Sequence, residues 1–217
     1  MFVDLSFPIE DGLATLPGVL PEARVGAILD HDASRDRYQG RAEFYLGKVD
    51  MPGNTGTYLD SPFHRHREAA DLAALPLERV ADLPGVMVHA PDANAPVDID
   101  LEPDRIRGRA VLVRTGWDGR WGTDAYWEPD PYLSEATLDA LIQGGAALVG
   151  VDFNNVDDTT DPARPAHTRL LGAGIPIVEH LTNLVALPED GFRFFAVPPR
   201  IVRGASFPVR AFAEFPG

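Results

Sequence analysis

Short apolar runs separated by turn-forming residues predict a chain built largely from short strands. Phe2–Ser6 and Ala42–Val49 alternate apolar and polar positions, which is typical of half-buried strands. Val86–His89 and Ala110–Arg114 are β-branched apolar runs, and such runs indicate central strands that are buried on both faces. Further strands are expected at three places: Ala147–Phe153, Ile175–Val178 and Phe194–Val197.

Helix signals are fewer, and the clearest helix is expected to begin at Ser134. Ser134 suits an N-cap, and Leu133 and Leu138 stand at the two positions of a hydrophobic staple. The glycine pair at 144–145 then provides a stop. A second, short helix is expected over His167–Leu171.

Interspersed strands with only two or three helices predict an α/β fold, with a mixed sheet or small barrel and flanking helices. Pro8–Pro21 predicts a loop, whereas Arg24–Asp36 is polar and its structure is ambiguous. The length of 217 residues favours a single core, so one domain is expected over residues 1–217.

Composition excludes several classes of function. The formal net charge of −14 argues against binding to nucleic acid or to an anionic membrane, because both need clustered Lys and Arg. The chain has no cysteine, so disulfides, thiolate metal sites and cysteine nucleophiles are excluded. The first residues lack the pattern of a secretory signal, and no apolar stretch is long enough to span a bilayer. A cytoplasmic protein that acts on a small molecule is therefore expected.

Four side chains that are far apart in the sequence carry candidate chemistry: Asp60, His64, His167 and Glu179. Two carboxylates and two imidazoles could bind a divalent cation and leave one general base. A carboxylate at a strand end is more often solvated or caps a turn, so the residue types alone leave both interpretations open.

The segment Asn54–His64 resembles the signature of the cyclase family, His-x-Gly-Thr-His-x-Asp-x-Pro-x-His. The matching residues are Gly56, Thr57, Asp60, Pro62 and His64. Further matches in the same order include Asp4-Leu5-Ser6, Val113 to Trp117, Val149 to Asp152 and His167 to Leu184. The family contains kynurenine formamidases, isatin hydrolases and dienelactone hydrolases. The resemblance implies a swivelling β/β/α fold, a homodimer or homotetramer, and commonly zinc or manganese.

Half of the family's metal motif is altered, because Asn54 and Tyr58 stand where the family has histidines. The resemblance assigns the remaining metal ligands to Asp60, His167 and Glu179. It implies one divalent ion rather than two, manganese or zinc before magnesium, or no ion at all, and no other cofactor. Imidazoles hold transition metals more tightly than neutral oxygens do, so the first family site is expected to be lost or weakened.

The resemblance makes His64 the acid and base of the reaction. Tyr58 is a second candidate catalytic residue, since its phenol could donate a hydrogen bond to an oxyanion.

Three residues are candidates for contact with the substrate. Leu16 occupies the position of a family tryptophan that lines the pocket, which weakens the case for formylkynurenine itself. Asn54 replaces a metal ligand, and Arg114 follows a buried strand and could bind a carboxylate, although a structural ion pair is the more frequent role.

The leading hypothesis is a metal-dependent hydrolase of a small cyclic or acylated amide or ester, of the arylformamidase type. One alternative is a metal-independent lyase, dehydratase or cyclase on the same scaffold that uses His64 and Tyr58. A second alternative is a binding protein without catalytic activity.

Overall fold

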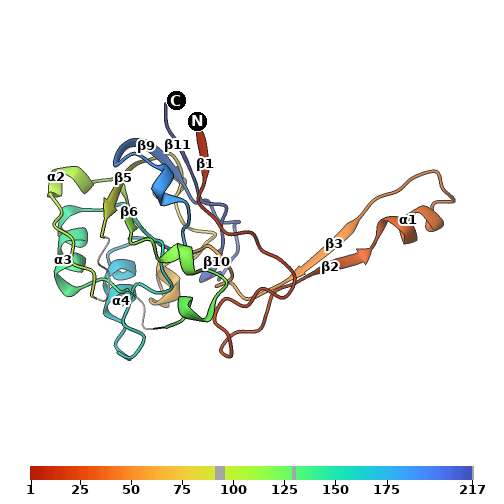
Figure 1. The fold of residues 1–217 in the computed structure, drawn as a ribbon, viewed down its shortest axis with the longest axis horizontal. Coiled ribbons are helices and arrows are strands. Elements are labelled where there is room, and N and C mark those ends of the chain that lie inside the picture. The colour runs from red at the N-terminus through yellow and green to blue at the C-terminus, as the bar shows by residue number, and fades with distance from the viewer. Residues whose placement is uncertain (91–95, 129–130, 217) are drawn as a thin grey trace.

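One large sheet and one small sheet form the framework of the molecule (Figure 1). The structure is a computed structural model, and it describes residues 1–90, 96–128 and 131–216. Within these residues the strands are β1 (Phe2–Asp4), β2 (Arg24–Leu29), β3 (Leu46–Asp50), β4 (Tyr58–Asp60), β5 (Leu83–His89), β6 (Ala110–Arg114), β7 (Leu148–Val151), β8 (Ile177–Glu179), β9 (Asp190–Phe195), β10 (Ser206–Pro208) and β11 (Phe212–Glu214). The helices are α1 (His31–Arg37), α2 (Pro103–Ile106), α3 (Glu135–Gly144) and α4 (Pro165–Gly172), with short 3-10 helices η1 (Pro62–His64), η2 (Leu77–Arg79), η3 (Trp117–Arg120), η4 (Asp124–Tyr126) and η5 (Leu184–Ala186).

The large sheet is mixed, and among the described residues its nine strands run in the order β1-β11-β9-β5-β6-β7-β8-β4-β10. The four central strands, β5 to β8, are parallel to one another, whereas the strands on both sides of them are antiparallel. The sheet curls into a half-barrel with a few flanking helices (Figure 1). The expected α/β fold with a mixed sheet is therefore confirmed.

The central strands are buried on both faces, as their continuous apolar runs predict. Along β6, Ala110 and Leu112 contribute to the hydrophobic core on one face of the sheet. Val111 and Val113 belong to a second core, on the face that α3 and α4 cover. This alternation follows from the two-residue period of a strand.

Helix α3 begins as the sequence predicts. The Ser134 side chain accepts a hydrogen bond from the backbone N–H of Thr137, and Leu133 and Leu138 are both buried in the core. Gly145 ends the helix with a φ of 76°, a left-handed conformation that glycine adopts without steric cost. No helix in the described part of the chain combines the length and apolar character needed to cross a membrane.

The main difference from the sequence prediction lies in residues 24–50. Arg24–Leu29 and Leu46–Asp50 pair as an antiparallel hairpin that carries α1, and this arm projects from the body of the molecule (Figure 1). The strand expected over Ala42–Val49 begins only at Leu46. The arm is exposed on both faces, so neither strand carries a pattern of one buried and one solvated side.

Strand pairing brings the candidate residues together. β4 lies between β8 and β10, and this register places Tyr58 opposite Glu179 and Asp60 opposite Ser206. α4 packs against η1, the turn that ends at His64. The site therefore lies where β4, β8 and β10 meet these two helices.

We expect Ser134→Ala to lower the free energy of unfolding by about 1 kcal/mol, because it removes the N-cap acceptor of α3. Urea unfolding of the two proteins measures the difference. Ser134→Thr keeps a hydroxyl at the cap and serves as the control, with most of the stability retained. Equal stability of the Ala variant and the parent protein would contradict the assigned cap.

Candidate metal and catalytic site

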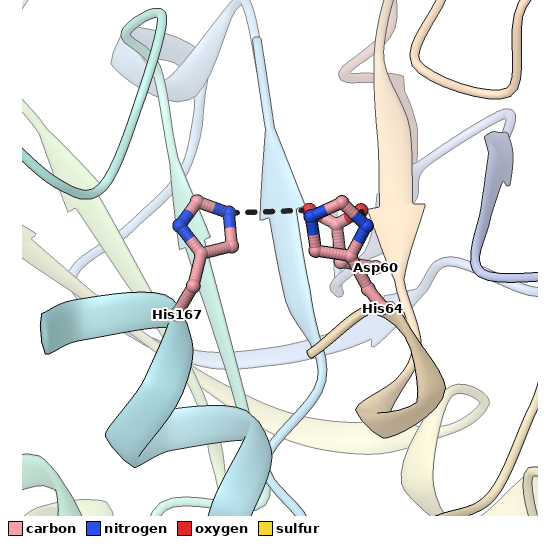
Figure 2. Close-up of side chains that lie close together, drawn as sticks. All are labelled: Asp60, His64 and His167. Carbon is pink, nitrogen blue, oxygen red and sulfur yellow. Dashed lines mark ion pairs between the residues drawn. The ribbon is translucent and has the colours of Figure 1, made fainter. Parts of the chain in front are cut away.

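Asp60 ends β4, and its carboxylate lies at the centre of the candidate site (Figure 2). The residue is fully buried. Its Oδ1 accepts a hydrogen bond from the Ser206 hydroxyl and lies 3.5 Å from Nδ2 of Asn54. Its Oδ2 has no hydrogen-bond partner among the described residues. A buried carboxylate oxygen without a donor is costly, so this atom indicates a place for a cation.

His167 enters the site from α4 (Figure 2), and Asp157 holds its imidazole. Its Nδ1 lies 2.6 Å from Oδ2 of Asp157. Burial favours the neutral carboxyl, but the hydrogen bond with His167 keeps the pKa of Asp157 below its usual value. The ionised Asp157 can only accept, so Nδ1 carries the proton. Nε2 then lies 3.6 Å from Oδ2 of Asp60 and 3.7 Å from Oε1 of Glu179.

The carboxylates around His167 favour a positive charge in this place. Burial lowers the pKa of His167, but the hydrogen bond with Asp157 and the nearby carboxylates of Asp60 and Glu179 outweigh burial and raise the pKa to about 10. Without another cation, the imidazolium itself therefore balances the buried negative charge. Metal binding would displace the proton from Nε2, because a metal ligand must be deprotonated.

Glu179 ends β8, and both of its oxygens accept hydrogen bonds. Oε1 accepts from the backbone N–H of Val156 at 2.8 Å, and Oε2 accepts from the Tyr58 hydroxyl. Burial raises the pKa of Glu179 to about 7. Burial and the nearby carboxylates also raise the pKa of Tyr58 well above its usual value, so the phenol stays a neutral donor. Tyr58 therefore directs its one proton at Glu179.

His64 follows Asp60 on η1 and is about one-third exposed. Its Nδ1 lies 3.1 Å from Oγ of Ser206 and 3.7 Å from Oδ1 of Asp60. Burial opposes the charged form of Asp60, but the interactions with His167 and His64 keep its pKa below the usual value. Because the ionised Asp60 must receive the Ser206 proton, Oγ of Ser206 accepts from Nδ1–H of His64. Nε2 of His64 is then left with a free lone pair.

A cavity of about 290 Å³ opens beside these groups. Its lining includes Tyr58, His64, His167 and Glu179 together with two of the proposed substrate contacts, Leu16 and Asn54. Arg114, the third proposed contact, ends β6 and is not among the lining residues described for this cavity.

Two polar residues of this site have no counterpart in the sequence prediction. Asp157 lies in the loop before α4, where it orients the imidazole of His167 and accepts hydrogen bonds from the first backbone N–H groups of the helix. Ser206 lies 146 residues after Asp60 and bonds to it across β10 and β4. Ser206 carries no local sequence signal because its partner Asp60 is distant in the chain. Asp157 carries none because its spacing from His167 matches no motif.

The donor set fits a divalent cation. Ligand atoms of Asp60, His64 and His167 all lie within 4.8 Å of one another, and Oε1 of Glu179 is adjacent. Two ligand atoms that each lie about 2.1 Å from a tetrahedral ion are about 3.4 Å apart. The distances from Nε2 of His167 to Oδ2 of Asp60, 3.6 Å, and to Oε1 of Glu179, 3.7 Å, are close to this value. The carboxylate of Asp157 on the outer nitrogen of His167 is the usual arrangement behind a metal-binding imidazole.

Comparison with known proteins places this geometry in a family. Residues 3–158 match the family described as Cyclase. A kynurenine formamidase of Salinibacter ruber is 31% identical over 181 residues, which cover 81% of this chain and 82% of that protein. A kynurenine formamidase of Bacillus cereus is 26% identical over 97% of this chain and 95% of its own length. The structure of isatin hydrolase A from Ralstonia solanacearum is 25% identical and has a TM-score of 0.83, covering 98% of this chain and 91% of that one. The chain belongs to the cyclase family.

We expect the metal-free protein to lose stability as the pH rises from about 6.5 to about 10. The folded-state pKa of His167, about 10, lies above the unfolded value of about 6.5, so the protonated imidazole stabilises the fold most at low pH. This stabilisation is lost as the pH rises through the folded-state pKa. Urea unfolding in the presence of a chelator measures the dependence. Asp157→Asn, which removes an imidazole partner, should flatten it, and a pH-independent stability of the parent protein would contradict the assignment.

Proposed function

We propose that this member of the cyclase family hydrolyses a small amide or ester, as an arylformamidase-type enzyme that uses one divalent metal ion. The observation that carries the proposal is the buried Oδ2 of Asp60, which faces Nε2 of His167 at 3.6 Å and has no hydrogen-bond partner within the described ranges of the chain. The kynurenine formamidases and the isatin hydrolase among its relatives support the reaction class.

Asp60, His167 and Glu179 would hold the ion, which we propose to be manganese or zinc. An imidazole nitrogen among carboxylate oxygens suits these metals better than magnesium, which prefers oxygen ligands throughout. A bound ion supplies a Lewis acid that polarises the scissile carbonyl and lowers the pKa of a water molecule. Asp157 fixes the tautomer of His167, and Val156 and Tyr58 fix the carboxylate of Glu179.

His64 acts as the general base and then as the general acid. Oγ of Ser206 accepts the hydrogen bond from Nδ1–H of His64, so Nε2 of His64 is free to accept a proton from the attacking water. The water oxygen bonds to the acyl carbon, and the C–N or C–O bond breaks. The proton on His64 then passes to the leaving nitrogen or oxygen, which returns the imidazole to its neutral form.

The role of Tyr58 differs from the one that its sequence position suggests. The phenol proton is engaged with Glu179, so we assign Tyr58 to holding that carboxylate rather than to an oxyanion. Metal-independent catalysis by His64 and Tyr58 would need this proton for the substrate. The hydrogen bond to Glu179 therefore favours the metal-dependent hydrolase.

We expect Asp60→Asn and His64→Gln to inactivate the enzyme by different routes. Asp60→Asn removes the charge that faces His167, so both metal content and activity should be lost. His64→Gln should keep the metal and lower kcat by roughly 10²- to 10⁴-fold, the usual contribution of a general base. Elemental analysis and release of formate from an aryl formamide measure the two effects. Full activity of the Asn variant without metal would contradict the proposal.

We also propose that the chain forms a homodimer or homotetramer through the arm of residues 24–50. A two-stranded hairpin is at best marginally stable alone in water, and this arm projects from the body. Seven of the fourteen exposed large hydrophobic side chains of the described residues belong to it: Val25, Ile28, Tyr38, Phe44, Tyr45, Leu46 and Val49. The arm has five basic and five acidic residues, so the charge of −14 lies outside it and a second copy approaches it with little repulsion.

We expect the purified protein to have at least twice the chain mass of 23.6 kDa in light scattering. The double variant Ile28→Asp with Val49→Asp should shift it to a monomer, because it places two charged groups among the exposed apolar side chains of the arm. Val202→Asp changes an apolar residue outside the arm that is more exposed than either of these two and should leave the mass unchanged. A monomeric parent protein would contradict the proposal.

A further inference from the structure

Two guanidinium groups line the catalytic cavity beside the two imidazoles. Arg65 directly follows His64, and Arg164 precedes His167 by three residues; both belong to the cavity lining. Neither forms an ion pair within 4.0 Å in the part of the chain that the structure describes, whereas several other arginines pair with carboxylates. Acidic residues outnumber basic ones by 33 to 19, so two such arginines in one cavity need an explanation.

Hydrogen bonds hold the Arg65 side chain in place and leave some N–H groups of its guanidinium free. Its Nε donates to Oγ1 of Thr168 at 2.9 Å, and its Nη2 donates to the carbonyl of Ala163 at 2.8 Å. A guanidinium has five N–H donors, so Nη1 and one hydrogen of Nη2 remain available. These contacts tie the end of η1 to the start of α4 and fix the position of the guanidinium charge.

Arg164 occupies a backbone conformation that side chains rarely adopt. It caps α4 with φ 47° and ψ 63°, in the left-handed region that favours glycine. Its Nη1 lies 3.5 Å from Oδ1 of Asn155, at the limit of a hydrogen bond, and Asn155 also lines the cavity. The neighbouring Asp158 carboxylate accepts hydrogen bonds from the N–H and hydroxyl of Thr160, and these bonds, with a smaller contribution from the charge of Arg164, keep its pKa below the usual value. A rare backbone conformation that places an arginine in a catalytic cavity is typical of a ligand site.

We propose that Arg65 and Arg164 bind a carboxylate of the substrate, and that the enzyme selects aryl amides or esters that carry this anionic group. Planar guanidinium groups match carboxylates in geometry and form charge-assisted hydrogen bonds with them. The net charge of −14 repels anions at long range, so a local pair of positive charges is needed to hold one in the cavity. The proposal rests on the proposed hydrolase function and adds the substrate class.

Two matched substrates test the selection: 2-formamidobenzoate, which carries a carboxylate, and the neutral 2-formamidobenzamide. Formate release measures turnover of the same bond in both compounds. Arg164→Gly removes the guanidinium but suits the left-handed backbone, so the variant should fold at least as well as the parent protein. We expect it to raise KM for the acid roughly tenfold or more, with kcat and the neutral substrate little affected. Arg164→Asn, which also tolerates this conformation, should behave in the same way.

Arg67→Gln is the control for general charge effects. Arg67 is exposed, lies two residues from Arg65 and does not line the cavity, so its loss should leave both KM values unchanged. Calorimetric binding of 2-aminobenzoate against 2-aminobenzamide repeats the comparison without turnover. The parent protein should bind the acid more tightly, and Arg164→Gly should abolish this difference.

The failures of the two proposals can be told apart. If the parent protein releases no formate from either compound but binds the acid through Arg164, the hydrolase proposal fails on these substrates and the anion site stands. If it hydrolyses both compounds equally well, and Arg164→Gly affects both or neither, the anion site is overturned and the hydrolase stands.

Discussion

The buried carboxylate of Asp60 is the constraint on which the rest of the site depends. One of its oxygens is bonded to Ser206, and the other has no hydrogen-bond partner among the described residues and faces His167. Such a group is tolerated in a protein interior only if a positive charge lies beside it. The imidazolium of His167 can supply that charge, and so can a metal ion that displaces its proton. Asp157 and Glu179 add further negative charge, which strengthens the demand for a cation.

The body of the fold could be predicted from the sequence wherever burial follows a simple period. The run Ala110–Arg114 gives a strand with the expected bounds because both of its faces are covered. The cap and stop of α3 are equally local, since Ser134 and Gly145 act on their own helix. The arm of residues 24–50 could be predicted only in part: the strand expected over Ala42–Val49 overlaps β3, but a hairpin that is exposed on both faces has no buried side to mark its strands. Only the structure shows that its apolar residues lie on an arm that projects from the body of the molecule (Figure 1).

The candidate site could be predicted only in part. The positions of Asp60 and His64 follow from a contiguous signature, and the structure brings both close to His167 (Figure 2). The residues that fix the protonation of the site could not be predicted. Strand pairing places Ser206 beside Asp60, and the start of α4 places Asp157 beside His167. Tyr58 illustrates the same limit: its place in the motif suggests a hydrogen bond to an oxyanion, whereas its hydroxyl donates to Glu179, its neighbour across the sheet.

The most direct test of this account is anomalous diffraction from crystals of the protein grown with manganese. The account predicts one strong anomalous peak per chain, within bonding distance of Oδ2 of Asp60 and Nε2 of His167, with Glu179 next to it. The absence of a peak there, in crystals of protein that is catalytically active, would contradict it. A peak located elsewhere in the cavity and away from Asp60 would contradict it equally.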